Sequence, residues 1–119
     1  MNCDLAVSRD ICLIRQCLGL STRIEIIVRP MPTQQGLWTL VCAAGIHGEQ
    51  PSSVKAQGPF YGLAEAQRVV EGVYDSLSLQ GYDVSNDPGI WRIHLMGEYR
   101  RFTGGVGHCA PCSSRPERE

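Results

Sequence analysis

The stretch TRIEIIVRP, Thr22 to Pro30, decides the fold, because apolar and polar residues alternate along it. One face of an extended chain would carry Ile24, Ile26 and Val28. The opposite face would carry Arg23, Glu25 and Arg29. This period of two is typical of a half-buried strand. Ile27 interrupts the polar face, so that face is not wholly polar.

The segments that follow predict two more strands. Leu37 to Ile46 is apolar on both alternating sets, which is typical of a central strand or of one whose second face is covered. Pro30 to Gly36 contains prolines and a glycine that cannot continue a ladder, so it is a loop. Ser53 to Gln57 is short and polar, and Lys55 fits the charge that edge strands often carry.

The clearest helix lies between Leu63 and Gln80, after the strand-breaking Gly58 to Gly62. Its apolar residues recur every three or four positions, which predicts an amphipathic helix with its stripe on the sheet. The stripe consists of Leu63, Ala66, Val70, Val73 and Leu77.

The two ends of the domain are predicted from similar patterns. Apolar residues at helical spacing between Asp4 and Leu18, followed by Gly19, predict a short helix. Ile90 to Tyr99 returns to period two, which predicts a strand. From Thr103 to Glu119 the glycine-rich sequence predicts a flexible tail, so one domain should span residues 1–102.

The predicted order is helix, three strands, helix, strand. This is an α+β fold, a small antiparallel sheet of about four strands with a long helix packed on one face. One helix would leave the second face of the sheet uncovered, and an exposed apolar patch there would suggest a protein contact. The predicted interface residues are Ile11, Ile14, Leu18, Ile27, Trp38 and Leu40.

Composition narrows the class of partner and the compartment. The chain has 119 residues, with 11 Lys+Arg against 12 Asp+Glu and a net charge of -1. It therefore has no broad positive electrostatic potential that would attract nucleic acid or an anionic membrane. No apolar run approaches the roughly 18 residues of a membrane span. Charged residues interrupt the N-terminal apolar segment, which excludes a signal-peptide pattern and predicts a cytoplasmic protein with reduced thiols.

Residues that could carry chemistry are few. His108-Cys109-Ala110-Pro111-Cys112 contains a Cys-x-x-Cys pair that can bind zinc or cycle as a dithiol, but no second close pair accompanies it. His47 and His94 have no nucleophile in a recognisable context. We therefore expect no catalytic residues, no cofactor and no metal site. Arg92, Arg100 and Arg101 form a small basic cluster, although the balanced charge makes nucleic acid an improbable ligand.

In length and layout the chain resembles the small bacterial antiactivators of quorum sensing, which bind and inhibit another protein. The resemblance implies a cytoplasmic homodimer that binds a LuxR-type transcription factor and blocks its dimerisation and DNA binding. The resemblance assigns no contact residues in this chain. The leading hypothesis is thus a non-catalytic protein-interaction regulator. The alternatives are a metal- or redox-linked regulator that uses Cys109 and Cys112, or a small nucleic-acid-binding domain.

Overall fold

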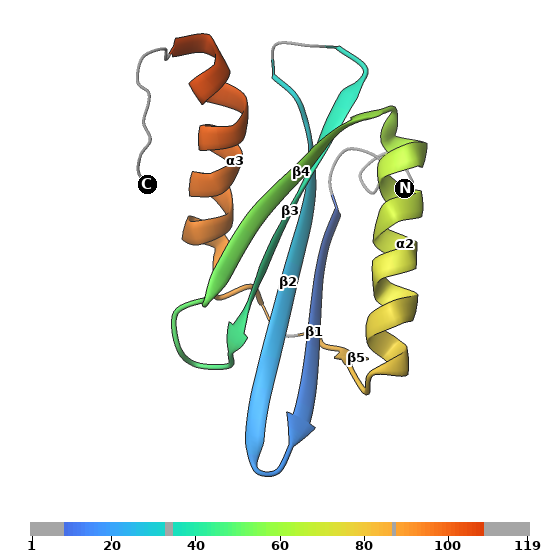
Figure 1. Ribbon diagram of the computed structural model, residues 1–119, viewed down its shortest axis with the longest axis vertical. Coiled ribbons are helices and arrows are strands. Elements are labelled where there is room, and N and C mark those ends of the chain that lie inside the picture. The colour runs from blue at the N-terminus through green and yellow to red at the C-terminus, as the bar shows by residue number, and fades with distance from the viewer. Residues whose placement is uncertain (1–8, 33–34, 87, 109–119) are drawn as a thin grey trace.

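The computed structural model describes residues 9–32, 35–86 and 88–108. Their elements are β1 (Arg9–Cys17), β2 (Leu20–Pro30), β3 (Leu37–Ile46), β4 (Ser53–Tyr61), α2 (Leu63–Leu79), β5 (Asp83–Val84) and α3 (Arg92–His108). The strands form a five-stranded antiparallel sheet in the order β4-β3-β2-β1-β5. Helix α2 covers one face and α3 the other (Figure 1). The α+β class is confirmed, whereas the strand count and element order differ from the prediction.

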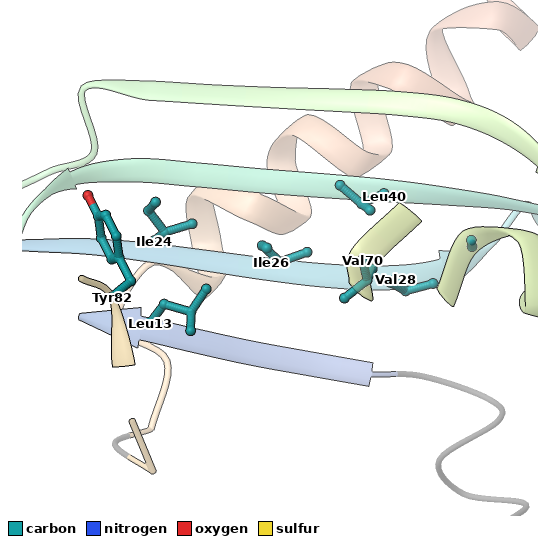
Figure 2. Packing of buried hydrophobic residues seen from close by; sticks show 8 residues of the cluster. Leu13, Ile24, Ile26, Val28, Leu40, Val70 and Tyr82 are labelled. Carbon is teal, nitrogen blue, oxygen red and sulfur yellow. The ribbon is translucent and has the colours of Figure 1, made fainter. Parts of the chain in front are cut away.

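The main core lies between the sheet and α2, as the alternation in β2 predicts. Ile24, Ile26 and Val28 all point into it and are at most 9% exposed. Figure 2 shows these side chains in one row, with Val70 of α2 at the Val28 end and Tyr82 at the Ile24 end. Leu13 from β1, Leu40 from β3 and Ala66 from α2 belong to the same cluster. The predicted helix is therefore confirmed, with its apolar stripe on the sheet.

The opposite face of the sheet is covered by α3. Ile27, Val41 and Ala43 form a second core there with Trp91 and Leu95, which are 2% and 1% exposed. The prediction that this face lacks a covering element is wrong. Ile27 breaks the polar pattern because it packs against α3.

Residues 9–17 form a strand and not the predicted helix; the earlier part of that prediction lies outside the described residues. Leu13 belongs to the α2-side core, while Ile14 opposes Arg23 across the ladder with β2. The hairpin turns at Leu18 and Gly19, both of which have positive φ. Gly19 ends the element as the sequence indicates, but it does so in a two-residue hairpin loop.

The predicted strand over Ile90 to Tyr99 is instead helical from Arg92 onward, where α3 begins directly after Trp91. Trp91 and Leu95 are four residues apart, which places both on one side of a helix, whereas Ile93 is 86% exposed. The helix continues past the predicted domain end at residue 102. Thr103 is 8% exposed, and its hydroxyl donates to the Tyr99 carbonyl at 2.8 Å. The rest of the predicted tail, 109–119, lies outside the described residues.

A buried ion pair fixes the segment that leads into α3. Arg23 and Glu25 are 0% and 3% exposed, and Arg23 Nε donates to Glu25 Oε2 at 2.6 Å. The same carboxylate accepts from the Ile90 and Trp91 backbone N–H groups at 2.8 and 3.3 Å. Arg23 Nη2 donates to the Pro88 carbonyl at 2.9 Å. Arg23 and Glu25, on the polar face of β2, therefore bind each other and the backbone of this segment and do not face water.

Candidate binding groove at the β1 edge

Both helices lie towards the β4 side of the sheet, and this exposes β1. Helix α2 packs chiefly over β2, β3 and β4, and α3 packs over β3 and β4. In Figure 1 the β1–β2 hairpin also projects beyond both helices at the bottom of the view. The hairpin end of β1 is therefore exposed, and along its whole length β1 lies away from the strands over which the two helices are centred.

The outer edge of β1 is paired over a short length. Within the described residues β5 forms ladder pairs with β1 at Leu13 and Ile14, and Ser85 N–H donates to the Cys12 carbonyl at 2.8 Å. In an antiparallel ladder alternate residues direct their backbone groups to the same side. Since Cys12 faces β5, the N–H and C=O of Asp10 also point outward, beyond the end of the β5 ladder.

A hollow of about 280 Å³ lies beside this edge on the α3 face of the sheet, here named the α3-side hollow. Polar and charged groups dominate its wall, and they come from β1, β2, the loop after β5 and α3. They are Asp10, Glu25, Ser85, Asn86 and Arg92.

A second hollow of about 470 Å³ lies on the α2 face, here named the α2-side hollow. Val70, Tyr74 and Val84 give its wall a partly apolar character, and Val84 is 56% exposed. The two hollows share five lining residues and so meet across the strand edge. The shared residues are Asp10, Ile11, Cys12, Ser85 and Asn86. We call the combined feature the edge groove.

Ion pairs hold the Asp10 carboxylate at the rim of the α3-side hollow. Its Oδ1 accepts from Arg29 Nη1 at 2.8 Å, and its Oδ2 accepts from Arg92 Nη1 at 3.3 Å. The Arg29 side chain is 14% exposed and that of Arg92 is 64% exposed. Two guanidinium groups therefore orient one carboxylate, an arrangement suited to positioning and to polar recognition.

A family model for the PA4575-like protein matches residues 7–118. The chain belongs to the PA4575-like protein family. No curated protein and no solved structure matches it. The family match spans every strand and helix described here and the whole edge groove. It shows no link to the antiactivators of quorum sensing.

In this PA4575-like chain the predicted interface residues do not form one surface. Ile11 lines both hollows, and Ile14 is half-buried on β1. Leu18 is 100% exposed at the hairpin tip, whereas Trp38 packs against the α2-side core. Ile27 and Leu40 are core residues, 4% and 2% exposed, because α3 and α2 cover them. Of the six, Ile11 lines both hollows of the groove, and Ile27 lines the α3-side hollow from the core beneath it.

The residues considered for metal binding, catalysis or nucleic-acid binding do not form a common site among the described residues either. Cys109 and Cys112 lie outside the described residues, and within 9–32, 35–86 and 88–108 no group of three or more potential metal ligands occurs. His94 is exposed on α3, and His47 Nδ1 lies 3.2 Å from Arg23 Nη1. Arg101 pairs with Glu98 at 2.7 Å. In the described part of the chain, no helix is long and apolar enough to cross a membrane.

Sequence reasoning missed most of the groove. Tyr74 lies at the margin of the helical stripe, and Val84 and Asn86 fall in a segment with the composition of a loop. Arg92 was assigned to a strand, which would separate it from Asp10. The one available signal was the apolar Val84 within that polar loop.

Proposed function

We propose that this protein is a non-catalytic regulator that binds another protein through the edge groove. The observation that carries the proposal is the pair of hollows on opposite faces of one strand edge, which share the residues from Asp10 to Cys12. The α2-side hollow, at about 470 Å³, falls within the range of about 300–1,000 Å³ for ligand pockets, and the α3-side hollow, at about 280 Å³, lies just below it. Most of their lining side chains come from strands and helices, which supports a preformed binding surface.

The resemblance in length and layout supports one specific partner for test. A quorum-sensing antiactivator would bind a LuxR-type transcription factor and prevent its dimerisation and DNA binding. This partner, and the homodimer that the same resemblance implies, rest on that resemblance alone. The edge groove would be the surface through which the partner is held.

Two matched tryptophan variants test the proposal. Glu71 and Asp75 are exposed acidic residues one helical turn apart on α2, but only Glu71 lines the α2-side hollow. Glu71→Trp should obstruct the hollow, whereas Asp75→Trp makes the same change in charge and bulk outside it. Both full-length variants would be used to capture proteins from the native cells, with quantitative mass spectrometry as the readout.

We expect partners retained by the unaltered chain and by Asp75→Trp to be lost with Glu71→Trp. Urea unfolding of both variants provides the folding control. Equal retention by the two variants would show that the groove does not bind the partner, and the proposal would fail.

A further inference from the structure

We infer that the edge groove binds an extended segment of the partner, which adds to β1 as an antiparallel strand in line with β5. This inference rests on the proposed function and specifies its ligand. It is supported by the backbone of β1, by the different character of the two hollows and by the contrast with the other edge of the sheet.

Asp10 supplies the backbone groups that an added strand would bind. Its N–H and C=O point away from β2, on the same side as the Cys12 carbonyl that Ser85 occupies. Ser85 lies opposite Cys12, whereas the Pro88 carbonyl lies on the α3 face, where it accepts from Arg23 Nη2 at 2.9 Å. An extended segment opposite Asp10 would therefore exchange two backbone hydrogen bonds with it and continue the line of β5. Strand addition of this kind derives affinity from main-chain groups and specificity from alternate side chains.

The two hollows define the side chains of that segment. Because successive residues of a strand point to opposite faces, the residue opposite Asp10 would enter the α3-side hollow, beside Asn86 and Arg92. Its neighbour in the segment would enter the α2-side hollow, against Val70 and Tyr74. The segment should thus alternate a polar residue with a large apolar one.

The opposite edge of the sheet lacks the features of a receiving strand. The predicted edge strand is confirmed as β4, which extends to Tyr61. It carries an exposed lysine, Lys55, a proline, Pro59, and a register shift where it pairs with β3 between Trp38 and Leu40. Edge strands are protected from pairing by such residues and irregularities. The start of β1 has no proline within Arg9 to Cys12, and its hollows are already open.

A peptide selection tests the ligand. Random heptapeptides displayed on phage would be panned against the full chain, and the enriched peptides would be synthesised. We expect the enriched sequences to alternate large apolar with polar residues. Failure to enrich any peptide, or enrichment of sequences without this alternation, would overturn the inference.

Two substitutions at Asp10 then separate the backbone from the side chain. Asp10→Ala and Asp10→Pro both remove the carboxylate, but only the proline removes the outward N–H. That N–H is not used in the ladder with β2, so proline is compatible with this edge position. By fluorescence polarisation the selected peptide should bind Asp10→Pro about two- to tenfold more weakly than Asp10→Ala, as loss of one backbone hydrogen bond predicts.

Amide hydrogen exchange of the unaltered chain supplies an independent measurement, which holds even if Asp10→Pro does not fold. The Asp10 amide should exchange freely in the protein alone and at least about tenfold more slowly with the peptide bound. An Asp10 amide that is already protected would mean that the chain itself or a second copy occupies the edge, which contradicts the inference.

The outcomes also distinguish this inference from the proposed function. If Glu71→Trp prevents peptide binding but Asp10→Pro and Asp10→Ala bind equally, the groove is a binding site and strand addition is wrong. If neither Glu71→Trp nor Asp10→Pro weakens binding, both the groove and the added strand are wrong.

Discussion

Replacing Glu25 by alanine should cause one of the largest losses of stability available in this protein. Glu25 is 3% exposed, and its carboxylate accepts from Arg23 Nε at 2.6 Å and from two backbone N–H groups at the start of α3. Alanine would leave the Arg23 guanidinium, which is 0% exposed, without its counter-charge. It would also remove the side chain that ties Ile90 and Trp91 to β2.

The magnitude follows from the burial of both partners. Removing one member of a buried ion pair costs about 3–5 kcal/mol, chiefly because the remaining charge is uncompensated. A buried backbone N–H without an acceptor adds about 1–3 kcal/mol where no water replaces the carboxylate. We therefore expect Glu25→Ala to lower the free energy of unfolding by at least about 3 kcal/mol. This is a large part of the total of about 5–15 kcal/mol that small domains have.

Urea unfolding followed by tryptophan fluorescence measures this loss, because Trp91 is 2% exposed in the folded protein. Glu71→Ala, at an exposed glutamate of α2, is the matched control and should change stability by less than about 0.5 kcal/mol. The double variant Arg23→Met/Glu25→Leu removes both charges and should be more stable than Glu25→Leu alone. A loss below about 1 kcal/mol for Glu25→Ala, or a double variant no more stable than that single one, would refute a buried pair beneath α3.

Three further substitutions or labels test separate parts of the fold. Leu18 has a φ of 55° at the hairpin tip, so Leu18→Asn should raise stability by about 1 kcal/mol and increase the thermal midpoint; an unchanged midpoint would argue against left-handed strain there. A Cβ on Gly45 would lie 2.8 Å from the Ser52 backbone nitrogen, so Gly45→Ala should destabilise by about 1–3 kcal/mol in urea unfolding. Iodoacetamide at pH 8 should label exposed Cys17 before Cys42, because burial raises the pKa of the Cys42 thiol; peptide mass spectrometry that finds the reverse order would contradict this burial.

The parts of the fold that the sequence predicted are those with a local and unambiguous period. The alternation through Ile24, Ile26 and Val28 specifies a strand whatever its neighbours are. The apolar stripe of α2 likewise specifies a helix whatever its neighbours are. The predicted range of this helix differs from Leu63–Leu79 by one residue.

Two segments were predicted in the wrong state because their local patterns fit both periods. In β1 the apolar Ile11 and Ile14 have helical spacing, yet the strand is stabilised by nine ladder positions with β2. In α3 the sequence from Trp91 to Leu95 alternates, yet Trp91 and Leu95 also share one face of a helix. For β1 the deciding contacts are with the neighbouring strand β2, whereas for α3 they are with Ile27, Val41 and Ala43, which are distant in sequence. In both segments these contacts override a local preference.

The edge groove was beyond prediction for the same reason. Asp10 and Arg92 are far apart in sequence and were assigned to the wrong kinds of element. Their ion pair exists because β1 and α3 meet beside β2. Of the groove residues, Ile11 and Ile27 were predicted, from their apolar character.

The sequence by itself thus determined the class of fold, the central strands and the long helix, because alternation and helical periodicity are properties of neighbouring residues. Only the tertiary structure decided what the polar face of β2 does. Arg23 and Glu25 have the pattern of a solvated face, but α3 and the loop before it cover them, and their charges bind each other and the backbone of that segment. That packing places α3 over β3 and β4, and the outer side of β1 is then paired only with the short strand β5 among the described residues. The candidate site is therefore a consequence of packing between distant segments, which no local pattern contains.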